Sequence, residues 1–194
     1  MLTFYFCPGS SSMAPHIALH EVGAAFEPKL TRLHQQQNRN PGYLALNPEG
    51  KVPTLVLEDG FPLTEVAAIL WYLARRYPEA GLLPAGDIEA ESKIISWMSF
   101  IAASIHPSRR AGVEAWRNIF RLTDAKFGQR EWAVGDHYTI ADIHLFRLFW
   151  RFVDALHPDR PEYPNLYGHY DRVLQRPAVM KTIEIETGHG YHLP

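Results

Sequence analysis

Apolar and polar positions along the first part of the chain predict strands and helices in alternation. Leu2 to Phe6 is a run of aliphatic, aromatic and β-branched residues that suits a buried strand, and Pro8-Gly9 ends it. Apolar residues at helical spacing follow over 15–22, Gly23 suits the end of that helix, and a second strand is expected over 26–33. This βαβ order predicts a parallel pair of strands.

A hairpin and another helix are expected next. The polar stretch 34–42 is expected to form an exposed loop or a short helix. The turn signal Glu58-Asp59-Gly60 joins two strand-like segments, 54–57 and 61–63, and a helix is expected over 65–77. The order βαβ followed by ββα predicts one small mixed sheet.

The rest of the chain has apolar residues at helical spacing only. Residues 77–87 hold two prolines and two glycines without periodicity, which predicts an interdomain linker. The pattern Thr139-Ile140-Ala141-Asp142 is a capping box at the start of a strongly apolar helix. A loose tail is expected from Gly188 onward. The expected helices are 88–105, 113–127, 139–156, 164–175 and 178–186, and the expected domains are 1–78, a linker at 79–87, and an all-helical domain at 88–194.

Composition narrows the class of protein. The chain has 194 residues, 46% hydrophobic and 21% charged, which are ordinary globular values. A net charge of -2 gives no support for a nucleic-acid partner. The single cysteine, Cys7, excludes an intrachain disulfide, and we expect neither a signal peptide nor a membrane-spanning segment. A soluble cytoplasmic protein is therefore the expected class.

Three consecutive serines, Ser10, Ser11 and Ser12, lie where the first helix is expected to begin. A serine at this place can accept a hydrogen bond from an unpaired backbone N–H of the first turn. The same N–H groups and the helix dipole favour an anion, such as a thiolate. From these residues alone, capping of the helix is the favoured interpretation.

Four motifs in order resemble those of glutathione S-transferases, most closely the bacterial beta class. PGSSSMAPHIAL resembles the turn and first helix, with Ser11 where the beta class has a cysteine. NPEGKVPTL resembles the asparagine-proline turn, LTEVAAILWYLARRYP the segment with a glutathione-contacting glutamate, and YTIADIHLF the capping box of the buried helix. The resemblance covers nearly the whole chain. It implies an α/β thioredoxin-like N-terminal domain, an all-α C-terminal helical domain and, usually, a homodimer.

The resemblance also implies a site for glutathione as co-substrate. Glutathione would pair like an added strand with the backbone of Val52, provided that the bond to Pro53 is cis. Glu65 would take the γ-glutamyl amine, and the N–H groups of Val66 and Ala67 would take a carboxylate. The alternative for Glu65 is an acid that only complements the helix dipole.

Two departures from the beta-class pattern affect this binding site. Val66 stands where the family usually has a serine, so one hydrogen bond to the ligand carboxylate is lost. A lysine of the polar loop has no counterpart, and His34 or Gln35 lies nearest to its position. Both departures imply a modest affinity for glutathione.

Several residues compete to activate the glutathione thiol. Ser11 matches the beta-class spacing, whereas Ser10 follows Pro-Gly directly, as the serine of the theta and delta classes does. Tyr5 would act as in the tyrosine-type classes, but an aromatic residue of a buried strand is the favoured interpretation. Cys7-Pro8-Gly9-Ser10 resembles the CPxS site of glutaredoxins and omega-class transferases, although a small buried residue at a strand end is the favoured role for Cys7.

The helical half holds a second group of candidates. His106 corresponds to a beta-class histidine that lines the active-site cleft, and a histidine at a helix C-terminus is an equally good interpretation. The segment from His106 to Thr139 is shorter than the family's two long helices. This implies a shallow, open pocket for the second substrate, or one covered by Trp116 and Phe120.

The leading hypothesis is a glutathione transferase that transfers the glutathione thiol to a small electrophilic or disulfide substrate. One alternative is a glutathione-dependent thiol or disulfide oxidoreductase that works through Cys7. Another is a non-catalytic member of the fold that binds a ligand or a partner. His16 and His20 are one helical turn apart, but no metal site is expected, because no third ligand is placed to complete one. Neither nucleic acid nor a membrane is expected as a partner.

Overall fold

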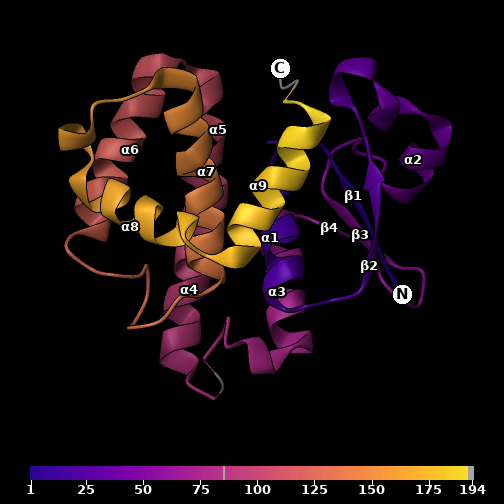
Figure 1. Cartoon of the computed structure of the whole chain (residues 1–194), viewed down its shortest axis with the longest axis horizontal. Helices are drawn as coiled ribbons and strands as arrows, with labels where there is room; N and C mark the ends of the chain where they lie inside the picture. Colours follow the sequence, from indigo (N-terminus) through magenta and orange to yellow (C-terminus); the bar gives the residue numbers. More distant parts are fainter. Residues whose placement is uncertain (85, 192–194) are drawn as a thin grey trace. The chain divides into compact units, whose positions relative to one another are not determined.

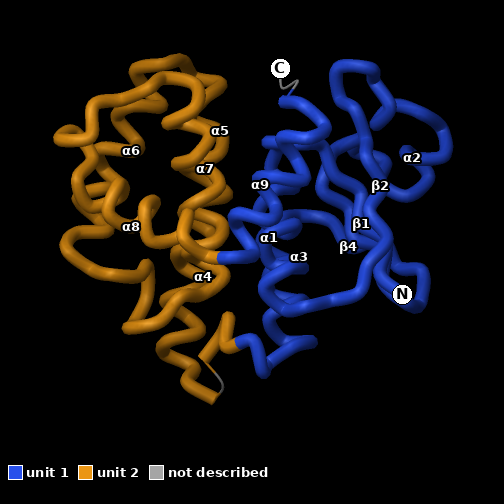
Figure 2. The backbone as a smooth tube through the Cα atoms, in the orientation of Figure 1, with its two compact units in different colours: residues 1–80, 177–194 blue, residues 81–176 orange. Residues whose placement is uncertain are grey.

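The computed structural model describes residues 1–84 and 86–191. The chain forms two compact units, coloured separately in Figure 2. The first unit contains Met1–Ala80 together with the C-terminal segment that begins at Pro177, and the second contains Gly81–Arg176. No helix within the described ranges is long and apolar enough to cross a membrane.

The first unit is built on a four-stranded mixed sheet, as the sequence predicts. Strand β1 pairs in parallel with β2 and antiparallel with β3, and β3 pairs antiparallel with β4, which gives the order β2-β1-β3-β4. Phe4 of β1 is completely buried and lies opposite Leu55 of β3, so the sheet contributes directly to the core. The strands are β1 (Leu2–Phe6), β2 (Phe26–Leu30), β3 (Thr54–Val56) and β4 (Pro62–Thr64).

Helices cover both faces of this sheet (Figure 1). α1 (Met13–Glu21) packs against α3 (Val66–Arg76) and α9 (Pro177–His189) on one face. The short helix α2 (Pro41–Leu46) lies on the other face. Three short 3₁₀ turns complete the unit, at Leu33–Gln35, Gln37–Arg39 and Pro78–Ala80.

The position of α9 differs from the sequence-based expectation. The sequence assigns this helix to the all-helical domain, but its buried stripe of Val179, Thr182 and Glu186 belongs to an element that packs on α1 of the first unit. The expected loose tail is helical up to His189, and the Tyr191 hydroxyl lies 3.0 Å from Thr187 Oγ1. The end of that tail, 192–194, lies outside the described residues.

The second unit is all-helical, and α7 is its central element. Most of the α7 side chains are buried, and α7 packs against both α4 and α8. The single helix expected over 88–105 is interrupted near its end by one π-helical turn, η4. The elements are α4 (Ile88–Phe100), η4 (Ile101–Ile105), α5 (His106–Ser108), η5 (Arg109–Ala111), α6 (Val113–Phe127), α7 (Ile140–Leu156), η6 (Arg160–Glu162) and α8 (Pro164–Leu174).

The capping box at the start of α7 forms as predicted. The Thr139 N–H donates to Asp142 Oδ2 at 2.9 Å, and the Thr139 hydroxyl accepts from the Ala141 N–H at 3.3 Å. The other carboxylate oxygen of Asp142 accepts from the Ala133 N–H at 2.7 Å and lies 3.0 Å from His169 Nε2. A fully buried carboxylate therefore ties the start of α7 to the preceding loop and to α8.

Candidate functional site

The turn between β1 and α1 is closed by the hydroxyl of Ser12. This hydroxyl accepts from the Cys7 N–H at 3.0 Å and donates to the Cys7 carbonyl at 3.0 Å. Ser12 is the first residue before α1, yet its side chain caps none of the helix N–H groups, so the capping expectation is wrong for this serine. Because its one proton goes to Cys7, the 2.8 Å contact with Ser10 Oγ uses the proton of Ser10.

Ser11 is the serine whose side chain is directed away from this closed turn. It is half-buried, whereas Ser10 is only 7% exposed and Ser12 is fully buried. The Ser11 hydroxyl donates to the carbonyl of Val52 at 3.0 Å. Two residues that the sequence assigns to the same candidate site, 41 positions apart, therefore lie in direct contact.

Hydrogen bonds from two buried side chains, Asn47 and Tyr43, fix the loop that contains Val52. The Val52-Pro53 bond is cis, as the resemblance implies. Asn47 donates from Nδ2 to the Lys51 carbonyl at 2.9 Å and accepts from the Glu49 N–H at 3.1 Å. The Tyr43 hydroxyl donates to the same Lys51 carbonyl. These contacts fix the backbone on the N-terminal side of Val52, and the sequence-based reasoning assigned no role to either side chain.

Gly50 in this loop cannot be replaced without moving its neighbours. Its φ is +62°, and a Cβ would lie 2.6 Å from the Arg39 guanidinium and 3.0 Å from the Asn38 carbonyl. The Asn38 side-chain amide donates to the Gly50 carbonyl at 2.7 Å. The loop is therefore packed closely against the polar segment before α2.

Glu65 stands at the N-terminus of α3 in an uncommon backbone conformation. Its φ of +67° lies in a region that non-glycine residues rarely adopt, and its side chain is exposed. Its carbonyl accepts the first helical hydrogen bond, from the Ile69 N–H at 3.0 Å. Val66 follows as the first helical residue and is buried. An outlier of this kind at an exposed acid is typical of a ligand-binding position.

The polar loop places its two candidates in a 3₁₀ turn. His34 and Gln35 lie in Leu33–Gln35, and both side chains are exposed. The Gln35 side-chain oxygen accepts from Gln37 Nε2 at 3.3 Å.

Cys7 lies at the end of β1 in a small apolar cluster. Its side chain is 2% exposed and packs with Tyr43 and Val52. Burial raises the pKa of the Cys7 thiol, and the nearby charge of Glu186 adds to the rise against the opposing effects of Leu33 and Arg32. A buried thiol with a raised pKa is poorly suited to attack a disulfide.

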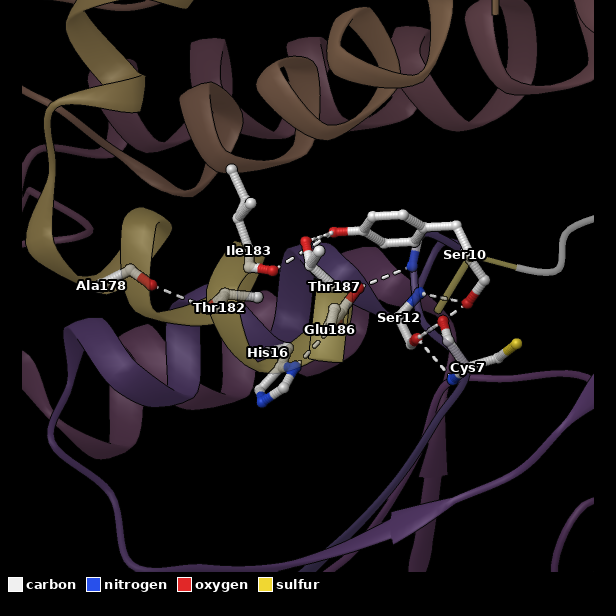
Figure 3. Close-up of polar contacts among 11 residues, drawn as sticks. Cys7, Ser10, Ser12, His16, Ala178, Thr182, Ile183, Glu186 and Thr187 are labelled. Atoms are coloured by element: carbon white, nitrogen blue, oxygen red, sulfur yellow. Dashed lines mark hydrogen bonds and ion pairs between the residues drawn. The ribbon is translucent and has the colours of Figure 1, made fainter. Parts of the chain in front are cut away.

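A buried histidine–carboxylate pair supports the same turn and was missed by sequence-based reasoning (Figure 3). His16 Nδ1 lies 2.8 Å from Glu186 Oε1, and the Gly9 N–H donates to Glu186 Oε2 at 2.7 Å. Glu186 comes from α9, so the C-terminal helix holds the residue that precedes the three serines. The sequence carries no local signal for this pair, because Glu186 resembles a surface acid until α9 is known to pack on α1.

Three candidate site residues, His106, Trp116 and Phe120, lie in the second unit. His106 directly follows the π-helical turn and is exposed, and the helical chain continues beyond it, so it does not stand at a helix C-terminus. Trp116 and Phe120 pack edge-on or tilted against Phe152 of α7, with ring centroids 5.3 and 4.5 Å away. Both are core residues of the second unit, so the expectation that they cover a substrate pocket is not supported.

The described residues contain no group of three or more His, Cys, Asp or Glu side chains placed to hold a metal ion. The two histidines of α1 have other contacts. The ring of His20 packs on His16 at 5.0 Å and on Phe26 at 5.6 Å between centroids.

Together, the mixed sheet, the cis-proline loop and the helical second unit define the glutathione transferase fold. The family model of the glutathione S-transferase N-terminal domain matches residues 9–76, and that of the C-terminal domain matches residues 91–177. The chain therefore belongs to the glutathione S-transferase family, which confirms the resemblance seen in the sequence.

Individual relatives match nearly end to end. Glutathione S-transferase GST-4.5 of Xanthomonas campestris is 34% identical, and GstA of Escherichia coli O157:H7 is 30% identical; each match covers 95% of this chain and 98% of the relative. Among solved structures, a sphingomonad glutathione S-transferase complexed with glutathione has a TM-score of 0.87 at 31% identity. A beta-class enzyme of Sphingomonas chungbukensis has a TM-score of 0.84 at 32% identity, and both alignments cover 95% of this chain and 98% of the other.

Proposed function

We propose that this chain is a glutathione transferase that binds glutathione in its first unit and uses the hydroxyl of Ser11 to activate the thiol. Two structures with 31% and 28% identity to the chain contain bound glutathione. The peptide would lie along the cis Val52-Pro53 loop, with its γ-glutamyl end at the exposed Glu65 and the N-terminus of α3. Gln35 is the proposed polar contact from the 3₁₀ turn.

The contact of Ser11 with Val52 carries this proposal. The Ser11 hydroxyl donates a hydrogen bond to the Val52 carbonyl at 3.0 Å. The cysteinyl N–H of an added peptide strand would donate to this same carbonyl. Binding of glutathione would replace one donor with the other and leave the Ser11 proton free to donate to the glutathione sulfur. A charge-assisted hydrogen bond of this kind favours the thiolate over the thiol.

The competing groups are less suitable. The proton of Ser10 is used within the closed turn by Ser12. Cys7 is buried and its pKa is raised, which argues against the oxidoreductase alternative. Tyr5 packs edge-on against Tyr43 with ring centroids 5.4 Å apart, as expected for an aromatic residue of the sheet.

The chemistry needs only these groups and the two substrates. The thiol proton of glutathione leaves to solvent, and the Ser11 O–H stabilises the thiolate that remains. The sulfur lone pair forms a C–S bond with the electrophilic carbon of the second substrate. The bond to the leaving group breaks, and the leaving group departs with that electron pair. A role in detoxification of small electrophiles follows from this reaction class.

The test is conjugation of glutathione to 1-chloro-2,4-dinitrobenzene by the wild type, Ser11→Ala and Cys7→Ala. Loss of one hydrogen bond to a charged group predicts a fall in kcat/KM of roughly 10- to 100-fold for Ser11→Ala. Thiolate absorbance of enzyme-bound glutathione, titrated with pH, should show a higher thiol pKa in this variant. Cys7→Ala should retain most of the activity, whereas loss of activity in Cys7→Ala but not in Ser11→Ala would support the oxidoreductase.

We further propose that the protein is a cytoplasmic homodimer. The single cysteine is free and buried, which suits a reducing compartment. Exposed apolar side chains on both units, Phe61 and Trp71 on the first and Ile88 and Ile95 on the second, supply surface that a partner copy would cover. Light scattering coupled to size-exclusion chromatography tests the dimer, and a mass of one chain at micromolar concentration would contradict it.

A further inference from the structure

The four strands of the first unit share one row of register partners at the edge of the sheet that carries the proposed glutathione site. β1, β2 and β4 end at this edge, and β3 begins there. Glu65 follows β4, and the Val52-Pro53 loop precedes β3. Cys7 follows β1, and Arg32 lies two residues beyond β2. The register partners of the row, from β4 to β2, are Thr64, Thr54, Tyr5 and Lys29.

An extended glutathione molecule would cross most of this edge. Neighbouring strands lie about 4.8 Å apart, so the edge from β4 to β2 measures about 14 Å. A three-residue peptide spans about 11 Å when it is fully extended. With its γ-glutamyl end at Glu65 and its cysteine paired with Val52, the peptide would direct its glycine past β1 toward β2.

A small hollow lies at this end of the edge, where β1 and β2 finish. Its volume of about 10 Å³ accommodates a group about the size of a water molecule, which is too small for a whole ligand. Cys7 lines the hollow and also packs with Val52, so the hollow and the proposed peptide-binding loop adjoin the same side chain. The hollow therefore suits the end of a ligand that lies along this loop.

Basic side chains surround the hollow. Arg32, His34 and His189 line it, and none of its described lining residues is acidic. The Arg32 guanidinium forms no hydrogen bond or ion pair with another described group. Burial raises the pKa of the Cys7 thiol, and the positive charge of Arg32 opposes that rise, so this charge lies near the hollow. A guanidinium in such a place favours a carboxylate.

Local contacts fix the Arg32 backbone and the His189 ring. The Thr31 N–H donates to the Phe6 carbonyl at 2.7 Å and so ties the end of β2 to the end of β1. The Arg32 N–H donates to Gln37 Oε1 at 2.8 Å. The His189 ring lies edge-on to Phe6, with centroids 6.0 Å apart. These contacts hold both residues before a ligand binds, which lowers the entropic cost of binding.

We propose that the glycine carboxylate of glutathione enters this hollow and is bound by the Arg32 guanidinium and a ring N–H of His189. The inference rests on the proposed function and adds two residues to its site, one of them from the C-terminal helix. A guanidinium binds a carboxylate through two parallel N–H donors, and His189 supplies a further donor. The site therefore selects γ-glutamyl thiols whose third residue ends in a free carboxylate.

Calorimetric titration of the full chain with glutathione, and with its neutral analogue γ-glutamylcysteinylglycinamide, tests the proposal. The wild type should bind glutathione about 10-fold more tightly than the amide, since hydrogen bonds to a charged group are the stronger ones. Arg32→Gln should lose most of this preference and bind the amide like the wild type. Lys29→Gln, which removes a positive charge from the exposed surface of β2, is the matched control and should keep the wild-type preference.

A second variant tests the contribution of α9. His189→Phe keeps an aromatic ring beside Phe6 and removes the ring N–H, so the preference for glutathione over the amide should fall severalfold. The double variant Arg32→Gln/His189→Phe should bind the two ligands with equal affinity. An unchanged affinity for the amide in each variant establishes that the protein is folded and that the Val52 loop is intact.

The possible results separate this proposal from the proposed function. If the wild type binds neither ligand, both are overturned. If the wild type binds the two ligands equally, the assignment of the carboxylate to this hollow is overturned, whereas glutathione binding in the first unit stands. The assignment is also overturned if Arg32→Gln or His189→Phe keeps the full wild-type preference for glutathione.

Discussion

His16 Nδ1 lies 2.8 Å from Glu186 Oε1, and both side chains are almost completely removed from solvent. The two residues are 170 positions apart and connect the first helix of the chain to the last. The second oxygen of Glu186 accepts from the Gly9 N–H at 2.7 Å, immediately before the three serines. The C-terminal helix is thus part of the framework that fixes the position of Ser11.

Removal of this carboxylate should destabilise the protein strongly. Glu186→Ala leaves the Gly9 N–H and His16 Nδ1 buried without their partner, and breaking a buried pair in this way costs about 3 kcal/mol. Glu186→Gln should cost less, since its amide can still accept from Gly9 and donate to His16. Urea unfolding measures the difference. Glu184→Ala, an exposed acid on the same helix, is the control and should change the free energy of unfolding by less than about 0.5 kcal/mol.

A second buried histidine, in α7, should make stability depend on pH. Burial lowers the pKa of His144 to about 3, and the positive charges of Arg147 and His106 add to the shift. The unfolded chain takes up this proton near pH 6.5, but the folded protein does so only near pH 3. The stabilising effect is therefore complete above pH 6.5 and is lost as the pH falls toward 3, by about 1.4 kcal/mol per pH unit.

His144→Leu tests this dependence with a side chain of similar size. In the wild type, His144 Nδ1 has no hydrogen-bond partner, so replacing the ring removes no hydrogen bond at this atom. We expect the variant to be about 2 kcal/mol more stable than the wild type at pH 5, relative to their difference at pH 7.5. His137→Leu replaces an exposed histidine and should keep the wild-type slope. Equal slopes in the wild type and His144→Leu would contradict the assignment.

The closed turn predicts that neighbouring serines have opposite phenotypes. Ser12→Ala removes the partner of the buried Cys7 N–H and one of the two donors to the Cys7 carbonyl, which still accepts from the Ser10 N–H at 3.0 Å. We expect a cost of about 1 to 3 kcal/mol in unfolding free energy. Ser11→Ala should leave unfolding almost unchanged and reduce turnover. Paired urea unfolding and conjugation assays on the two variants measure this contrast. A stable Ser12→Ala protein would show that the hydroxyl does not hold the turn.

The sequence contained most of the architecture of the first unit. Alternating apolar runs and the Pro8-Gly9 and Asp59-Gly60 breaks predicted β1 to β4 in order, because local spacing and turn chemistry determine where strands end. Tertiary packing determined the rest. Glu186 resembles an ordinary surface acid unless α9 is known to cross onto α1, and no local pattern reports a contact between the two ends of the chain.

The sequence named members for the candidate site but did not decide between their possible roles. Motif resemblance named Ser11, Val52 and Glu65, whereas the serine run alone favoured helix capping. Which hydroxyl closes the turn depends on the path of the backbone between Cys7 and Ser12, and neither propensity nor spacing encodes that path. The positive φ of Glu65 is imposed by its surroundings, since glutamate has no preference for it.

Tyr43, whose hydroxyl bonds to the Lys51 carbonyl beside Val52, is predicted to affect the affinity for glutathione indirectly. Tyr43→Phe removes the hydroxyl that contacts the Lys51 carbonyl and Thr54 Oγ1, the latter at 3.0 Å. We expect a loss of about 1 kcal/mol in stability and a severalfold weaker affinity for glutathione, because the backbone beside Val52 is less well fixed. Calorimetric titration of glutathione measures the affinity. Tyr77→Phe, outside this loop, should bind glutathione like the wild type.

The Cys7 thiol should be unreactive toward disulfide reagents in the folded protein. Its thiol is 2% exposed and its pKa is raised by burial, so both access and the thiolate fraction are low at pH 8. Labelling with a disulfide reagent such as 5,5′-dithiobis(2-nitrobenzoate) should be at least about 100-fold slower in buffer than in denaturing urea, since the reagent must wait for a local opening. Glutathione should not change the native rate. Rapid labelling of the native protein, or a mixed disulfide formed with oxidised glutathione, would instead show that the turn opens to Cys7 and would favour thiol–disulfide exchange over Ser11-assisted transfer.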